Sequence, residues 1–307
     1  MPAPAVPKLW LWPPSGVAAP AIAARCLFTQ LGVGDDALAR GSYFESATIF
    51  ACETFRALSP SPAPLEPVVE LSSTPRDGFA AITLAHPLST GRAEAGDACP
   101  LLGRDFVPAP GQPAHVRLGA ASLVVARGRG EDRGPPRALL TRRGPWMRTF
   151  PRAWVCPGGG VDAGETPAAA AARELREETA LATSGGSALA GIWESVFPTN
   201  AEAVAVGGGE VKAHFALLFY TAEVETLPAP PQSAAPWPPR PTLQPEECDA
   251  AVWVTPGDLE VGGIRGYDAK GEPIEIEAAQ IAGIYPNSIG EGIAQGNRWA
   301  LETLAGS

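Results

Sequence analysis

Short apolar runs bounded by proline or glycine recur along the first third of the chain and predict β-strands. The expected strands are Leu9–Trp12, Val68–Leu71 and Ala80–Leu84. Glu45–Leu58 is expected to form a helix, and the proline-rich stretches Pro60–Pro67 and Val107–Pro113 are expected to be linkers. Residues 1–112 contain no recognisable catalytic constellation, so we interpret them as a β-rich extension or small domain of unknown role.

The pattern changes near His115, where strand-like segments surround one strongly helical segment. Ala121–Arg127 and Arg137–Thr141 are separated by a charged loop, which predicts a hairpin. Thr166–Thr179 is the clearest helix, with a capping threonine, a proline in the first turn and five consecutive alanines. The remaining expected elements are a β-rich segment over Val211–Val224, a strand over Ala250–Val254 and a helix within residues 287–304. Strands on both sides of one strong helix predict an α/β fold around a mixed sheet.

The length of 307 residues corresponds to about two domains at roughly 100–200 residues each. We expect a core domain over 113–260, with a proline-rich insertion at 227–245, and a C-terminal segment over 261–307 whose final helix packs on that core. The 34 glycines and 34 prolines predict long irregular loops between these elements.

The net charge of −10 argues against an extended surface for nucleic acid or for an anionic membrane. No run of 18 apolar residues is present, so no transmembrane helix is expected, and the first residues resemble neither a signal nor a transit peptide. The five cysteines are scattered without a CxxC pair, and the three histidines lie far apart, which argues against a zinc site. We therefore expect a cytoplasmic protein with reduced thiols, and nothing in the sequence indicates an oligomeric state.

Three glutamates on the predicted helix share one face. Glu174, Glu177 and Glu178 stand at positions i, i+3 and i+4, where like charges weaken a helix by a few tenths of a kcal/mol per pair. A divalent cation would offset this repulsion, and a set of hard oxygen ligands favours Mg²⁺ or Mn²⁺. The glycines before the helix would let the backbone approach the metal or a phosphate closely. Three acids alone also fit a solvated surface helix, so the wider pattern decides between the two interpretations.

The spacing over Gly159–Leu181 closely resembles the Nudix box, GX5EX7REUXEEXGU with U an aliphatic residue. Gly159, Glu165 and the run Arg173–Glu178 occupy its fixed positions. Ala180 stands where the family has a glycine that helps the chain leave the helix, so some loss of stability is expected there. The resemblance implies a Nudix fold, an α/β/α sandwich around a mixed sheet, and an Mg²⁺- or Mn²⁺-dependent enzyme that hydrolyses a nucleoside diphosphate linked to another group.

The resemblance also implies roles for the residues of the box. Glu174 and Glu178 would be direct metal ligands, Glu177 a further ligand, and the carbonyl of Gly158 would also face the metal. Arg173 would orient the glutamates while paired with Glu165.

The general base would be Glu177, Glu178 or, as in some Nudix enzymes, a glutamate from a later loop. Glu246 and Glu247 are candidates for that loop residue, and exposed loop acids without a role are the alternative.

Two patterns in the flanks suggest different substrates. Leu139–Gly159 and Gly191–Pro198 resemble the nucleoside diphosphate-linked moiety X motif 17 subfamily of mRNA-decapping Nudix hydrolases, which implies a capped RNA end. Leu139–Gly159 also resembles the coenzyme A diphosphatase motif LLTxR(S/A)xxxRxxxGxxxFPGG, but Gly144, Arg152 and Cys156 depart from it. Coenzyme A or a thioester of it is therefore the alternative substrate, and a catalytically silent nucleotide-binding module is the alternative from another class.

Either phosphate-rich substrate suits the arginines of the same stretch, because the guanidinium group matches phosphate oxygens. The candidate substrate-binding residues are Arg142, Arg143, Arg148 and Trp146. Trp146, Trp154 and Trp193 could stack on a base. For Trp154 and Trp193 the alternative is a place in the core, which we favour for Trp154.

Overall fold

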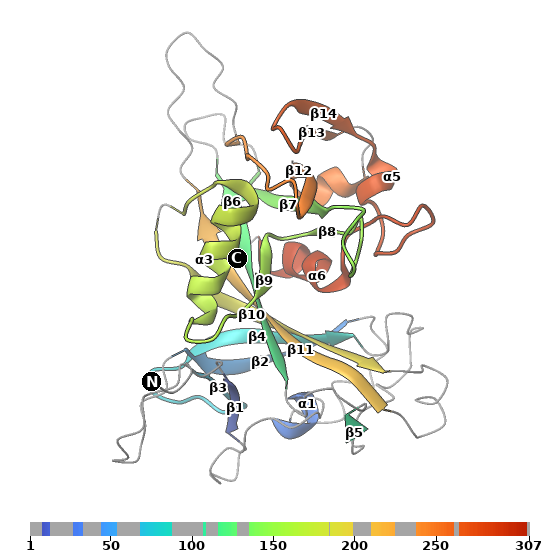
Figure 1. Cartoon of the computed structure of the whole chain (residues 1–307). Coiled ribbons are helices and arrows are strands. Elements are labelled where there is room, and N and C mark those ends of the chain that lie inside the picture. The colour runs from blue at the N-terminus through green and yellow to red at the C-terminus, as the bar shows by residue number, and fades with distance from the viewer. Residues whose placement is uncertain are drawn as a thin grey trace. The chain divides into compact units, whose positions relative to one another are not determined.

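The computed structural model describes residues 8–12, 27–32, 44–53, 68–87, 107–108, 116–127, 135–183, 185–198, 210–224, 238–260 and 264–305. The chain divides into two compact units (Figure 1). The first comprises residues up to Gly119 together with 160–167 and 190–218, and the second comprises 120–159, 168–189 and 219–307. Strands β6, β9, β10 and β11 therefore have residues in both.

The first unit is built around a mixed sheet. Its strands are β1 (Lys8–Trp12), β2 (Phe44–Cys52), β3 (Val68–Ser72), β4 (Ala80–Pro87), β5 (Val107–Pro108) and most of β10 (Ala188–Pro198) and β11 (Glu210–Glu223). β1 pairs with β3 and β10 pairs with β4 in parallel, whereas β2 runs antiparallel between β3 and β4. A short helix, α1 (Leu27–Gln30), also belongs to this unit. The predicted strands at Leu9–Trp12, Val68–Leu71 and Ala80–Leu84 are confirmed.

The helix predicted over Glu45–Leu58 is wrong, because Phe44–Cys52 forms the strand β2. Thr48, Ile49 and Phe50 are β-branched or aromatic residues that favour a pleated surface. In the strand, the backbone of this segment pairs with β4 on one side and with β3 on the other. Residues 54–58 and the linker Pro60–Pro67 lie outside the described part of the chain.

Two other predictions fall on segments that the structure describes only in part. The linker predicted over Val107–Pro113 begins with the two-residue strand β5, which pairs with β11 in parallel. Of the insertion at 227–245, only the residues from 238 onward are described.

The second unit contains an antiparallel series of strands with helices on both faces. Its strands are β6 (Arg117–Ala126), β7 (Arg137–Arg143), β8 (Trp154–Val155), β9 (Gly158–Gly160), β12 (Cys248–Val254), β13 (Ile264–Asp268) and β14 (Pro273–Ile276). β6 pairs with β7, β7 with β12, β12 with β13 and β13 with β14, while β8 pairs with β7 and β9 with β6. The predicted hairpin between Ala121–Arg127 and Arg137–Thr141 is confirmed. The unit also contains α3 (Pro167–Thr179), η1 (Pro256–Glu260), α5 (Ala278–Ile281) and α6 (Gln295–Thr303).

Helix α3 covers one face of these strands. Leu175 is fully buried in a cluster that includes Val124, Leu139 and Trp253. The Ser122 hydroxyl donates to the carbonyl of Ala171 on the same face. Burial of the Leu175 side chain stabilises this packing by about 1.5–3 kcal/mol.

Helix α6 covers the opposite face of these strands. Phe219 and Val224 are five residues apart, so they point to opposite sides, and Val224 belongs to the cluster under α3. The Phe219 ring packs edge-on against Trp299 of α6, with centroids 5.9 Å apart. The α/β character and the layered, mixed-sheet architecture expected from the sequence are confirmed.

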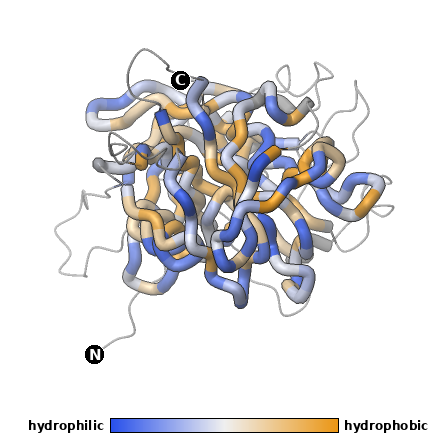
Figure 2. The backbone as a smooth tube through the Cα atoms, turned by 90° about the horizontal axis from the view of Figure 1, so that it is seen from above, coloured by the Kyte–Doolittle hydropathy of each residue, from blue (hydrophilic) through white to orange (hydrophobic). Residues whose placement is uncertain are grey.

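Hydrophobic and hydrophilic residues alternate over short distances along the backbone, as expected of strands buried on one face (Figure 2). Trp154 is a buried core residue, as predicted, and Trp193 is buried as well. His86 and His214 are also buried, and His214 Nε2 lies 2.7 Å from Glu194 Oε1. Of the described cysteines, Cys156 and Cys248 are buried free thiols. No helix in the described segments is long and apolar enough to cross a membrane.

Candidate active site

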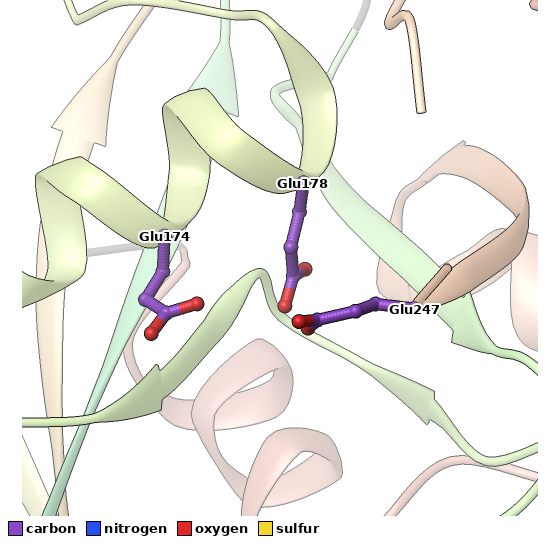
Figure 3. A group of neighbouring side chains, drawn as sticks. All are labelled: Glu174, Glu178 and Glu247. Carbon is purple, nitrogen blue, oxygen red and sulfur yellow. The ribbon is translucent and has the colours of Figure 1, made fainter. Parts of the chain in front are cut away.

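The carboxylates of Glu174, Glu178 and Glu247 converge, each offering an oxygen within 4.8 Å of the others (Figure 3). Glu174 and Glu178 project from one face of α3, one turn apart, and Glu247 reaches toward Glu178 from the turn before β12. Glu178 is buried, whereas Glu174 and Glu247 are partly exposed. The i, i+4 spacing on the helix therefore produces the shared face that the sequence predicted, and a residue distant in sequence completes it.

The end of α3 fixes where Glu247 lies. The N–H of Gln244 donates to the carbonyl of Glu178 at 3.1 Å, and that of Thr242 donates to the carbonyl of Thr179 at 2.9 Å. These bonds satisfy carbonyls that a helix end leaves without partners. The same bonds attach the segment leading into β12 to the helix, which brings Glu247 to the glutamates of α3.

Two glycines allow the close approach at the base of the cluster. A Cβ at Gly159 would lie 2.4 Å from Oε1 of Glu174, and one at Gly158 would lie 2.4 Å from the carbonyl oxygen of Ala120. The N–H of Gly158 donates to the Glu178 carboxylate. The close approach of this backbone to a metal or a phosphate stays a prediction, as does the metal contact of the Gly158 carbonyl.

The Glu178 carboxyl group has two further neighbours that the sequence did not reveal. Thr141 Oγ1 donates to Glu178 Oε2 at 3.3 Å, and Cys248 Sγ lies 3.7 Å from the same oxygen. Thr141 is in β7 and Cys248 begins β12, so neither belongs to the box. The only signal for Thr141 is its place in a strand beside the helix, which the sequence alone does not link to Glu178.

Burial and like charge both act against ionisation in this cluster. Desolvation, together with the charges of Glu174 and Glu247, raises the pKa of Glu178 to about 8. Burial likewise raises the pKa of Glu174, although the hydrogen bond and charge of Arg173 oppose this effect. A cation bound between the carboxylates would offset the cost of burying their charges and the repulsion between them. The donor set of carboxylate oxygens suits a hard divalent metal.

Arg173 contacts two of the predicted residues. Its Nη1 lies 2.9 Å from Glu174 Oε1 and 3.0 Å from Glu177 Oε2. Glu177 is half exposed and is not part of the convergent group, so its role as a further ligand stays a prediction. Glu165 Oε2 accepts the N–H of Asp162 at 3.3 Å, and the pairing of Glu165 with Arg173 also stays a prediction.

Arg142, one of the candidate substrate-binding residues, lies in β7 on the face away from Glu178. Thr141 points toward Glu178, and by alternation Arg142 points to the opposite face. There Arg142 pairs with Asp249 at 2.6 Å and Glu291 at 3.5 Å. These contacts give no support to substrate binding by Arg142.

The other substrate-binding candidates lie in or next to the loop after β7. Arg143 Nε donates to the carbonyl of Thr149 at 3.1 Å, and Arg148 is exposed. Trp146 is 58% exposed, so it is not a core residue. Their substrate roles stay predictions.

Part of this chain is similar in sequence to known proteins. The NUDIX domain family matches residues 116–273, about half of the chain. The m7GpppN-mRNA hydrolase NUDT17 of Danio rerio is 36% identical over 155 residues, which cover 50% of this chain and 46% of that protein. The protein of the same name from Xenopus laevis is 43% identical over 88 residues, which cover 28% of this chain and 27% of that protein.

The chain thus spans less than half the length of either relative. A solved MutT NUDIX hydrolase from Burkholderia pseudomallei is 19% identical, with a TM-score of 0.33 over 62% of this chain and 98% of that one. The match over residues 116–273 contains the whole glutamate cluster, and on that basis this chain belongs to the NUDIX family.

Proposed function

We propose that this protein hydrolyses a diphosphate bond in a nucleoside diphosphate-linked substrate, and that the substrate is the capped end of an RNA. The convergence of Glu174, Glu178 and Glu247 carries the proposal. The similarity to two m7GpppN-mRNA hydrolases supports the capped substrate.

These three carboxylates would hold Mg²⁺ or Mn²⁺. When bound, the metal would neutralise the diphosphate and lower the pKa of a water molecule, so that hydroxide is available at neutral pH. Arg173 keeps Glu174 in place through its 2.9 Å ion pair. Thr141 and the Gly158 N–H orient the buried Glu178 carboxylate. A base supplied by the protein would come from the same cluster.

The basic residues near the cluster would bind the phosphates of the substrate. Arg143 is the last residue of β7, and Arg148 lies in the loop after it, which also carries Trp146. Arginine binds phosphate oxygens through paired hydrogen bonds, which suits a 5′–5′ triphosphate bridge.

The test is a turnover assay read by mass spectrometry. Capped RNA, coenzyme A, ADP-ribose, NADH and diadenosine polyphosphates are offered in parallel with Mg²⁺ or Mn²⁺, and Glu178→Gln serves as the control. We expect cleavage of capped RNA at the diphosphate, and a decrease of about two to four orders of magnitude in the variant.

Other results have distinct meanings. Cleavage of coenzyme A alone would keep the hydrolase and replace the substrate. Turnover by Glu178→Gln within a few-fold of the unmodified protein would reject the assigned site. Binding of nucleotides without any cleavage would instead indicate a silent binding module.

A further inference from the structure

Two turns that are distant in sequence are joined by two hydrogen bonds beside the glutamate cluster, one from the main chain and one from a side chain. The N–H of Gly144 donates to the carbonyl of Glu247 at 2.7 Å. The indole Nε1–H of Trp146 donates to the carbonyl of Glu246 at 2.6 Å. Two consecutive carbonyls of the turn that carries Glu247 are therefore held by the turn after β7.

The indole ring of Trp146 lies directly against Gly144. A Cβ at position 144 would lie 2.4 Å from Cε2 and 2.5 Å from Cζ2 of the ring, which is closer than real Cβ contacts. A serine or alanine at this position would displace the ring, so glycine here and the bound position of the indole depend on each other. The ring is 58% exposed, and burial of apolar surface alone does not explain its position.

The turn at 244–247 is thus anchored on two sides. On one side, the N–H of Gln244 bonds to the carbonyl of Glu178 at the end of α3. On the other side are the bonds from Gly144 and Trp146. Between these anchors the Glu247 carboxylate lies near the carboxylates of Glu174 and Glu178, and these groups repel one another when they are ionised.

We propose that Trp146 is a positioning residue, which holds the turn at 246–247 so that Glu247 stays in the glutamate cluster. The inference rests on the proposed metal-dependent function, because its consequence is metal affinity. Without the indole bond, the backbone of the turn would have one anchor fewer against the repulsion from the α3 glutamates. Glu247 would then leave the cluster more often, and the metal would lose one of three ligands.

The test measures Mn²⁺ affinity in the full-length, substrate-free protein by calorimetry or electron paramagnetic resonance. We expect Trp146→Ala to weaken Mn²⁺ binding about tenfold, the scale of one net hydrogen bond. Trp146→Phe keeps a ring beside Gly144 but lacks the same N–H, so it should also lose about tenfold. Phe150→Ala is the matched control, because it removes an exposed aromatic ring from the same loop, and Mn²⁺ affinity should not change.

A double-mutant cycle isolates the link to Glu247. In a Glu247→Gln background, Trp146→Ala should cause little further loss, because the carboxylate that it positions is already absent. An equal loss in both backgrounds would overturn the proposal. An unchanged Mn²⁺ affinity in Trp146→Ala together with a raised KM would also overturn it and would favour a base-stacking role instead.

Two further measurements keep the outcomes distinct. Urea unfolding midpoints identify any variant that has lost its fold, and Trp146→Phe then carries the test. Glu178→Gln reports on the site itself. If it binds Mn²⁺ as the unmodified protein does, the proposed function fails at its metal site. If it loses Mn²⁺ while both Trp146 variants keep it, only the positioning role fails.

Discussion

The buried Glu178 carboxyl group should make the metal-free protein less stable as the pH rises. Its pKa is raised from 4.5 to about 8, first by burial and then by the charges of Glu174 and Glu247. In the unfolded chain the same group ionises near its ordinary value. Between about pH 4.5 and pH 8 the folded protein therefore binds more protons than the unfolded chain, and its stability falls through that window.

The magnitude follows from the same two values. One pKa unit corresponds to about 1.4 kcal/mol, so the difference between 4.5 and about 8 sets a ceiling of about 5 kcal/mol. Such a loss would be a large fraction of a typical unfolding free energy of about 5–15 kcal/mol. Glu178→Gln keeps the shape of the side chain without the ionisation. We therefore expect this inactive variant to be more stable than the unmodified protein at pH 8 when metal is absent.

The assay is urea unfolding in EDTA at pH 5, 6, 7 and 8. The midpoint of the unmodified protein should fall with pH, and that of Glu178→Gln should fall much less. When Mn²⁺ replaces EDTA at pH 8, the urea midpoint of the unmodified protein should rise again. The midpoint of the variant should not, because only the unmodified protein retains the buried ligand. Glu177→Gln is the matched control, because Glu177 directly precedes Glu178 in the same helix, is half exposed and lies outside the cluster. Equal midpoints at pH 5 and pH 8 for the unmodified protein, or the same slope in Glu178→Gln, would refute the reasoning.

Three further predictions concern individual positions. Ala180 has a φ of 56°, where an L-residue costs about 1–2 kcal/mol, so Ala180→Gly should raise the unfolding free energy by about 1 kcal/mol in urea titrations, and a decrease would contradict this. Gly159→Ala would place a Cβ 2.4 Å from Glu174 Oε1 and displace that carboxylate, so Mn²⁺ affinity should fall at least tenfold in calorimetric titrations. Gly160→Ala is the control, because its Cβ would meet nothing within 4 Å, and it should leave the affinity unchanged. Arg148→Ala should mainly raise KM, because Arg148 is exposed on the loop after β7, and an unchanged KM for every active substrate would reject its substrate role.

Local signals explain which elements could be predicted from the sequence. Helix α3 could be predicted from local signals, namely Pro167, the alanine run and the spaced glutamates, and the structure confirms the helix. Phe44–Cys52 has no comparably strong local signal, and its pairing with β3 and β4 decides its conformation. A helix prediction failed there because the deciding interactions come from residues elsewhere in the chain.

The site divides in the same way. Glu174 and Glu178 could be predicted because a helix of regular geometry fixes the relative positions of side chains four residues apart. The presence of Glu247 in the cluster depends on hydrogen bonds from Thr242 and Gln244 to the end of α3, so spacing along the chain could only make it a candidate. Thr141 and Cys248 were missed because their contacts with Glu178 arise from strand pairing.

Two departures from the family patterns lie at residues with positive φ angles. Arg152 stands where the coenzyme A diphosphatase motif has glycine, and Ala180 stands where the Nudix box has glycine. Both have positive φ angles, 62° and 56°, a conformation that favours glycine.

At Arg152 the cost is opposed by an ion pair of 2.8 Å with the buried Glu291, which glycine could not make. At Ala180 the described contact is the ordinary helix-ending bond from its N–H to the carbonyl of Arg176. The replacement of glycine at 152 thus adds an interaction that ties the loop after β7 to the C-terminal segment. Neither Arg152 nor Ala180 belongs to the glutamate cluster, so these departures leave the proposed set of metal ligands intact.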